Sequence, residues 1–312
     1  MVTPSQVAIR DKIVSPPHGF PMYNRYMLFA FAFLRGLSQI MLQENAATGL
    51  LFLIAIALGS PELLIGTMLG ATVGMLTAKT LNIAETKIHQ GLFGYNSALV
   101  GMAIFYFYDI NMASILLILF GSILSSHILN SLFKLDLKIP AYTAPFVIST
   151  WLMLLLAPYL GLSVAVISPA PMLDTSLLSY VGAVGQVMFQ ESILVSLLFI
   201  IALAFHSIQA AIWAMLASGL AVVCAMSFGF PDELIRLGLF GYNAVLVAIV
   251  LSAKFGLNLI PTLLGIVISV ILTRGFQLIE VPALTAPFVL ACWLVNGGHL
   301  IWSQKGFSAV TK

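Results

Sequence analysis

The sequence predicts an all-α integral membrane protein made of two related halves, and three observations lead to this fold class. Only 8% of its 312 residues are charged and 61% are hydrophobic, whereas a soluble domain carries about 25% charged residues to face water. Apolar stretches of about twenty residues, the length that a helix needs to cross a bilayer core, recur along the chain. Several blocks of sequence also occur twice. We therefore expect a duplicated bundle of helices whose outer surface meets lipid.

The duplication is visible in three blocks that occur twice in the same order. The first two pairs lie 147 positions apart and the third pair 142. They are "GLSQIMLQE" (36–44) with "AVGQVMFQE" (183–191), "GLFGYN" (91–96) with its copy (238–243), and "KIPAYTAPFVISTW" (138–151) with "EVPALTAPFVLACW" (280–293). A nearly constant offset over three blocks indicates an internal repeat.

The repeat divides the chain into five parts. The first 25 residues lack the apolar core and cleavage site of a signal peptide, so they are expected to remain as a cytoplasmic tail. The residues between the halves are rich in proline and small side chains. The expected parts are an N-terminal tail (1–25), a first repeat (26–160), an extracytoplasmic linker (161–176), a second repeat (177–302) and a C-terminal tail (303–312).

Each half contains six apolar segments that we expect to be helical. The glycines of GLFGYN and the proline of Thr-Ala-Pro-Phe interrupt the helical pattern in both halves. In the first half the segments are Tyr26–Gln43, Asn45–Ser60, Leu63–Lys79, Gly91–Tyr108, Met112–Phe133 and Ala141–Tyr159. In the second half they are Leu177–Gln190, Ile193–Phe205, Ile208–Phe228, Gly238–Ala253, Asn258–Thr273 and Pro282–Ile301.

The distribution of lysine and arginine predicts how these segments cross the membrane, because both residues collect on the cytoplasmic side. If one segment per half only enters and returns, five cross and the two halves are inverted. With the first segment of each half re-entrant, only Arg236 and Arg274 of the basic residues outside the segments face outward. A re-entrant GLFGYN segment fits almost as well, so both choices stay open, whereas six crossings per half fit worse. We therefore expect two inverted-topology repeats, each with five transmembrane helices and one re-entrant pore helix, which is a transporter architecture.

The apolar segments contain few charges, so uncharged polar pairs are the candidates for lining a pathway. These pairs are Gln39 with Gln186, Thr143 with Thr285, and Asn96 with Asn243. Such groups often only hold membrane helices together, but their recurrence favours a role in permeation for the glutamines and threonines. The asparagines could equally bond backbone groups freed by the helix break. The scarcity of charge points to a neutral solute that moves down its gradient.

Several other functions are disfavoured. Glu44 and Glu191 are interpreted as interfacial anchors or pairing partners, and His89 as a loop residue. Cys224 and Cys292 lie in apolar runs and are interpreted as small buried hydrophobes. No metal-ligand spacing, phosphate loop or nucleophile elbow occurs, and a net charge of +2 is too small to imply nucleic acid. We expect no enzyme activity, no metal and no cofactor.

The repeated motifs resemble the urea transporter family, and the short tails resemble its bacterial members. The resemblance rests on the doubled Gly-Leu-Phe-Gly-Tyr-Asn, the doubled Thr-Ala-Pro-Phe, and "LRGLSQIM" with "GQVMF" ahead of them, and it covers residues 34–293. It implies facilitative, channel-like permeation of urea across the cell (inner) membrane. It also implies a homotrimer in lipid with one pore per protomer, in which flat urea passes single file through a narrow slot.

The resemblance also implies roles for individual residues. Glutamines at the two ends and threonines at the centre would accept hydrogen bonds from urea, between aromatic and aliphatic walls. Leu42 stands where the family pattern has phenylalanine, and Leu239 stands for another aromatic, so one mouth would be looser and less selective for urea. The implied pore residues are Gln39, Gln186, Thr143, Thr285, Tyr95, Tyr242, Leu99, Leu246, Val187, Phe189, Ile40, Leu42 and Leu239.

Alternative functions stay open from the sequence. An ion- or proton-coupled carrier would need a titratable group at the midplane. A channel of the same design could instead conduct another small neutral amide, ammonia or water. An intramembrane enzyme would need paired carboxylates, metal ligands or an activated serine.

Overall fold

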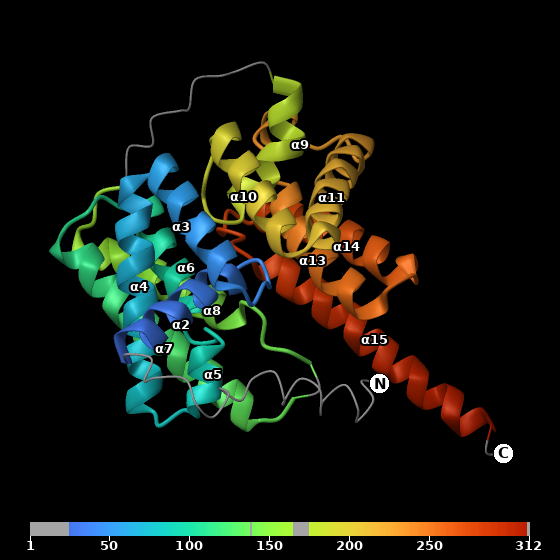
Figure 1. Ribbon diagram of the computed structural model, residues 1–312. Coiled ribbons are helices and arrows are strands. Elements are labelled where there is room, and N and C mark those ends of the chain that lie inside the picture. Colours follow the sequence, from blue (N-terminus) through green and yellow to red (C-terminus); the bar gives the residue numbers. More distant parts are fainter. Residues whose placement is uncertain (1–24, 138, 165–174, 311–312) are drawn as a thin grey trace.

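The computed structural model describes residues 25–137, 139–164 and 175–310, and these residues form a bundle of helices (Figure 1). Within the described ranges, the only β-type pairing is an isolated bridge between Tyr108 and Val164. Residues 1–24 of the predicted N-terminal tail, Lys138 and most of the predicted linker (165–174) lie outside the described residues.

The helices follow the same order in the two halves of the chain. The first half contains α2 (Arg25–Gln39), α3 (Ala46–Gly59), α4 (Pro61–Thr80), α5 (Glu85–His89), α6 (Tyr95–Phe107), α7 (Met112–Lys134) and α8 (Ala144–Leu156), followed by the 3₁₀ turn η1 (Ala157–Leu160). The second half contains α9 (Thr175–Gln186), α10 (Ile193–His206), α11 (Ile208–Ser227), α12 (Asp232–Arg236), α13 (Gly241–Phe255), α14 (Leu259–Leu278) and α15 (Ala286–Val310).

These helices agree with the twelve predicted segments in position but differ at several ends. Helix α6 begins at Tyr95, inside GLFGYN, and α8 begins at Ala144, each several residues after the predicted start, because the residues just before them form turns. The short helices α5 and α12 were not predicted, since five residues are too few for a recognisable period. Helix α15 extends to Val310, so its backbone continues through most of the stretch (303–312) that the sequence suggested was a tail.

Side-chain caps explain where several helices begin. The Asn45 side chain accepts a hydrogen bond from the Thr48 amide at 2.9 Å and starts α3. The Ser60 side chain accepts a hydrogen bond from the Leu63 amide and starts α4. Pro61 lies in the first turn of this helix, where its nitrogen has no hydrogen to donate and so needs no partner. Asn111 and Ser114 form a reciprocal capping box at the start of α7.

Breaks in the helices occur at equivalent positions of the two halves. Leu42 and Phe189 have φ of 62° and 57°, and Gly91 and Gly238 have φ of 78° and 73°. At Gly91 a side chain is excluded as well, because a Cβ atom would lie 2.2 Å from the amide nitrogen of Gly36. The repeated motifs therefore encode repeated backbone turns.

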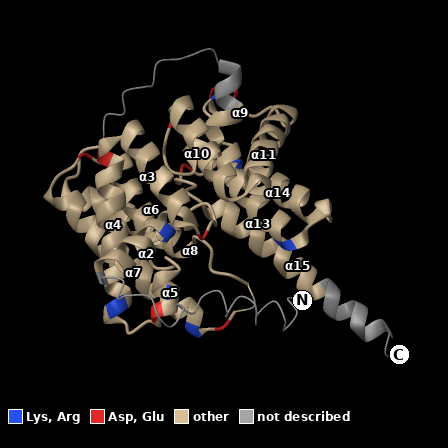
Figure 2. Cartoon of the chain, in the orientation of Figure 1, with Lys and Arg blue, Asp and Glu red and all other residues tan. Residues whose placement is uncertain are grey.

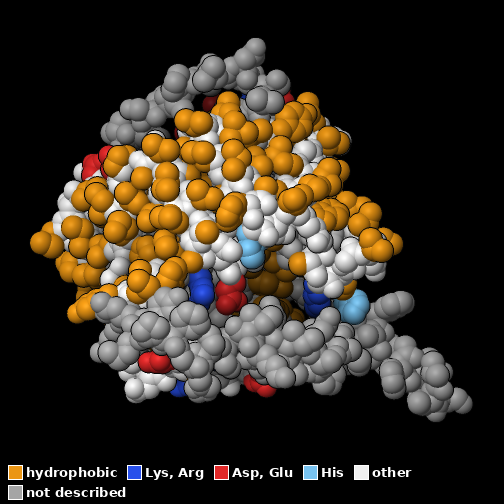
Figure 3. Space-filling view, viewed as in Figure 1, with side chains coloured by type: hydrophobic (Ala, Val, Ile, Leu, Met, Phe, Trp, Pro, Cys, Tyr) orange, Lys and Arg blue, Asp and Glu red, His pale blue; other side chains and the backbone are white. Residues whose placement is uncertain are grey.

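The surface of the bundle fits a membrane protein. Within the described ranges, four helices are long and apolar enough to cross a bilayer, namely α4, α7, α11 and α14. Hydrophobic side chains cover most of the described surface in Figure 3, and charged residues lie mainly near helix ends and connections in Figure 2. Large side chains such as Phe120 and Ile260 are 62% and 74% exposed, which is costly in water but favourable against lipid tails.

Helices α4 and α6 pack unusually closely. Gly66, Gly70 and Gly74 are spaced four residues apart on one face of α4. A Cβ atom on each would lie within 2.4 Å of a backbone oxygen of Phe93, Ser97 or Gly101. A stripe of small residues allows two membrane helices to approach until their backbones touch.

Residues at equivalent positions join the two halves. The rings of Phe52 in α3 and Phe199 in α10, which are 147 positions apart, pack edge to face with centroids 5.2 Å apart. The indole nitrogen of Trp151 donates to the Pro282 carbonyl at 2.8 Å. That of Trp293 donates to the Pro140 carbonyl at 2.9 Å. These three contacts between the halves thus join residues at equivalent positions or occur as a reciprocal pair.

Candidate functional site

Two threonines meet where the halves join. The hydroxyl oxygens of Thr143 and Thr285 lie 2.6 Å apart, and both residues are almost fully buried. Thr143 occupies the residue before α8, where a hydroxyl commonly caps the helix, yet it makes no such bond. Its hydroxyl is directed to the other threonine instead.

Two asparagines supply the missing helix caps from neighbouring helices. Asn96 in α6 accepts a hydrogen bond from the Phe146 amide of α8 at 3.2 Å. Asn243 in α13 accepts one from the Phe288 amide of α15 at 3.1 Å. Of the two interpretations left open by the sequence, the structure supports the bonding of backbone groups. The asparagines leave the threonine hydroxyls available for each other.

The two glutamines are held in the same way in each half. The side-chain nitrogen of Gln39 donates to the Gln90 carbonyl at 3.1 Å, and that of Gln186 donates to the Leu237 carbonyl at 3.4 Å. Only the NH₂ group of an amide can donate to a carbonyl, so these bonds orient both side chains. Among the described residues no donor is bonded to either Oε1 atom, which leaves both oxygens able to accept.

Four of the predicted apolar pore residues belong to one buried cluster. Ile40, Leu99, Val187 and Leu246 are each at most 2% exposed and share the main hydrophobic core. That core also contains the partly buried Leu42, Phe189 and Tyr242 at its edge. Leu239 is half-buried and is not part of this cluster.

The aromatic residues differ between the two ends. The Tyr95 hydroxyl donates to the Tyr142 carbonyl at 2.7 Å. At the other end, the ring of Phe189 lies 5.0 Å from that of Tyr106, whose hydroxyl donates to Glu191 at 3.4 Å. Glu191 therefore accepts a hydrogen bond from Tyr106, a partner that the sequence analysis did not propose.

A cavity of 690 Å³ opens beside Gln39. Three predicted pore residues line it, namely Gln39, Leu42 and Tyr95. The further lining residues, which the sequence analysis did not propose, include Leu92, Tyr142 and Trp293. All three lie within the repeated blocks, so the repetition itself was a signal that could have identified them.

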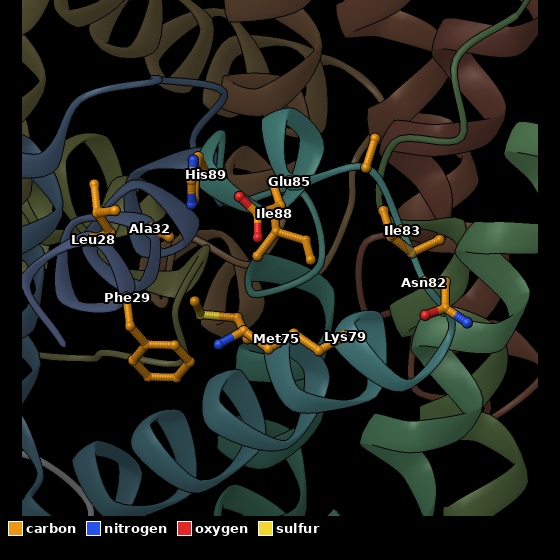
Figure 4. Close-up of a pocket in the computed structure, with 11 residues that line it drawn as sticks. Leu28, Phe29, Ala32, Met75, Lys79, Asn82, Ile83, Glu85, Ile88 and His89 are labelled. Carbon is orange, nitrogen blue, oxygen red and sulfur yellow. The ribbon is translucent and has the colours of Figure 1, made fainter. Parts of the chain in front are cut away.

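A second cavity of 470 Å³ lies between α2, α4 and α5 (Figure 4) and contains none of the predicted pore residues. Lys79, Glu85 and His89 supply its polar wall. The backbone carbonyl of His89 accepts a hydrogen bond from Arg35 at 3.1 Å, so Arg35 ties α2 to the residues ahead of GLFGYN. Within the described part of the chain, no three histidine, cysteine, aspartate or glutamate side chains lie close enough together to hold a metal ion.

A model of the urea transporter family matches residues 30–298, which is most of the chain. The chain belongs to the urea transporter family. Urea transporter 1 of Ovis aries is 27% identical to it over 294 residues, covering 84% of this chain and 74% of the relative. The protein of the same name from Mus musculus is 29% identical over 251 residues, covering 71% of this chain and 62% of the relative. That from Rattus norvegicus is 28% identical over 293 residues, with 84% and 74% covered.

Family membership confirms the resemblance drawn from the repeated motifs, and it confirms facilitative urea transport rather than catalysis as the function. The matched range contains every predicted pore residue of this urea transporter, from Gln39 to Thr285. The described structure brings together the two threonines, the four buried aliphatic residues and one glutamine with its cavity.

Proposed function

We propose that urea passes through this transporter between its two halves, along a path from Gln39 through the threonine pair to Gln186. The observation that carries the proposal is the direct contact of the Thr143 and Thr285 hydroxyls. Each half also contains a glutamine whose Oε1 accepts no hydrogen bond among the described residues. Leu99, Leu246, Ile40 and Val187 would form the apolar walls near the centre. Tyr95, Tyr242, Leu42, Phe189 and Leu239 would line the two mouths.

The chemistry of urea suits these groups. Urea is planar, with four N–H donors at its edges and two faces that tolerate apolar contact. Removing water costs about 1–3 kcal/mol for each polar group left unsatisfied. Weak acceptors spaced along the path would replace the lost water and still let the molecule leave.

The same groups disfavour ions. The named residues around the threonine pair are uncharged, and helices α8 and α15 both begin one residue after a threonine. The positive ends of two helix dipoles therefore face the pair and would repel cations. A proton- or ion-coupled carrier would need a carboxylate, histidine or other charged group here, and the residues proposed for the path include none.

We also propose that the halves are inverted repeats with five crossings and one re-entrant helix each. Reciprocal contacts such as Trp151 with Pro282 and Trp293 with Pro140 are what a two-fold relation produces. Both candidates for the re-entrant segment remain compatible with helix length. Helices α2 and α9 have 15 and 12 residues, and α6 and α13 have 13 and 15. Such helices span at most about 22 Å, less than the bilayer core of about 30 Å.

The proposed setting is the cell (inner) membrane, with both termini in the cytoplasm and one pore in each protomer of a trimer. The positions of the lysines and arginines support this orientation. In this orientation the 690 Å³ cavity opens towards the cytoplasm, because the cavity lies beside the end of α7 that carries Lys134. The trimer rests on the family resemblance, and its test is the mass of the purified complex in detergent.

The proposed passage is tested by stopped-flow light scattering on proteoliposomes that face a urea gradient. We expect rapid flux that does not saturate and does not depend on pH near neutrality or on sodium, because the residues proposed for the path carry no charge. Flux that collapses with a proton or sodium gradient would favour the carrier. Flux no faster than in empty vesicles would refute the proposal.

We expect Leu42→Phe to raise the selectivity for urea over acetamide several-fold. Phe189, at the equivalent position, has nearly the same backbone conformation, so the larger ring fits the turn and narrows the mouth. The measurement is the ratio of the two fluxes in the same vesicles. Leu58→Phe, at a site that is 65% exposed on the outer surface, is the control, and an unchanged ratio in both variants would contradict a role for Leu42 at the mouth.

A further inference from the structure

A chain of hydrogen bonds runs from the end of α13 to the 690 Å³ cavity. Lys254 is exposed at the end of α13 and donates to the Oδ1 atom of Asn296 in α15. The Nδ2 atom of Asn296 donates to the hydroxyl of Tyr142 at 3.2 Å. Asn296 is only 1% exposed, and Tyr142 lines the cavity together with Gln39.

This chain has a defined direction. A lysine ammonium can only donate, so the Asn296 carbonyl must face Lys254 and its NH₂ group must face Tyr142. The Tyr142 oxygen is then the acceptor of that bond. Among the described residues no acceptor is bonded to the phenolic O–H of Tyr142, so its proton remains available to a molecule in the cavity.

The position of Tyr142 is held by the surrounding structure. Its φ of 47° lies in the left-handed region, which is unfavourable for a bulky residue and often marks a functional site. Its carbonyl accepts the Tyr95 hydroxyl, and its ring packs against Phe288 with centroids 5.2 Å apart. The equivalent residue of the second half is Leu284, which has the same φ of 46° but no hydroxyl.

We propose that Tyr142 donates a hydrogen bond to the carbonyl oxygen of urea in this cavity, and that Asn296 and Lys254 position it. The Oε1 atom of Gln39 can accept from an N–H edge of urea but offers nothing to the carbonyl. Tyr142 supplies the complementary donor. Hydrogen bonds in a directed chain strengthen one another, so the donation from Lys254 through Asn296 makes the Tyr142 hydroxyl a better donor.

This inference rests on the proposed passage of urea and makes the two mouths of the path chemically different. The mouth beside Gln39 has a hydroxyl donor at position 142. The second half has leucine at the equivalent position, and the nearby Tyr106 hydroxyl is already donated to Glu191. The water bound to the carbonyl oxygen of urea would therefore be replaced by a protein hydroxyl only at the mouth beside Gln39.

The test compares urea flux in proteoliposomes for the parent, Tyr142→Phe, the pair Asn296→Leu with Lys254→Met, and all three changes together. We expect Tyr142→Phe to slow urea about fivefold, which is the effect of losing one ordinary hydrogen bond. The Asn296/Lys254 pair should slow it about threefold to fivefold. Because the pair acts through the hydroxyl, it should have no further effect once Tyr142 is phenylalanine. Tyr159→Phe, at an 88% exposed tyrosine, is the control and should keep the parent rate.

Two results would overturn the inference while leaving urea transport intact. One is a parent-like rate in Tyr142→Phe. The other is a loss in the triple variant that equals the product of the separate losses, which would indicate a general structural effect of Asn296 and Lys254. If Tyr142→Phe does not fold, as judged by its elution as a single species in detergent, a parent-like rate in the Asn296/Lys254 pair refutes the proposal by itself. If the parent conducts no urea above empty vesicles, the proposed passage fails first.

Discussion

Replacing Thr143 by valine is expected to slow urea flux about tenfold without unfolding the protein. Valine has nearly the shape of threonine, so the packing at the start of α8 is retained while the hydroxyl is lost. The change removes an acceptor at the narrow centre of the path and leaves the Thr285 hydroxyl without its partner at 2.6 Å. A tenfold change corresponds to about 1.4 kcal/mol, within the range of about 1–3 kcal/mol for one unsatisfied polar group.

The measurement is the initial rate of urea flux in proteoliposomes at equal protein content. Thr262→Val is the matched control, because Thr262 is fully buried in α14 and its hydroxyl has no hydrogen-bond partner among the described residues. The control should keep the parent rate. Thr285→Val should match the loss in Thr143→Val, because the two residues are equivalent. A Thr143→Val protein that folds and transports at the parent rate would remove the threonine pair from the path.

Replacing Gly101 by alanine is expected to lower the melting temperature strongly and to reduce the yield of folded protein. The added Cβ atom would lie 1.9 Å from the carbonyl oxygen of Gly66. Because that oxygen belongs to the backbone, α4 and α6 would have to separate. Overpacking of this kind lowers the free energy of unfolding by about 1–3 kcal/mol or more. Urea flux should fall as well, because α6 carries both Tyr95 and Leu99.

Gly275→Ala in α14 is the matched control, because an added Cβ atom there meets nothing within 4 Å. Alanine is the better helix former by about 1 kcal/mol, so this variant should melt at the parent temperature or above it. Thermal unfolding in detergent, followed by loss of the single elution peak, compares the two. Equal melting temperatures for Gly101→Ala and Gly275→Ala would show that the close contact of α4 with α6 is not required.

The sequence predicted the parts of this protein that depend on local patterns. Composition predicted membrane helices because lipid removes the need for a charged surface. The recurrence of GLFGYN and Thr-Ala-Pro-Phe predicted the duplication, the family and most of the candidate pore residues. The Gly66-Gly70-Gly74 spacing was also visible in the sequence, but its partner helix was not, because a stripe of small residues does not name the helix against which it packs.

By itself, then, the sequence determined the membrane class, the helical segments, the duplication and the residue types available for a neutral solute. These properties follow from hydrophobicity and spacing, which are local. Only the tertiary structure decided that the Thr143 and Thr285 hydroxyls meet, that Asn96 and Asn243 cap α8 and α15, and that Lys254 reaches Tyr142 through Asn296. Each of these depends on the distance and direction between side chains on different helices, and packing of the whole chain sets both.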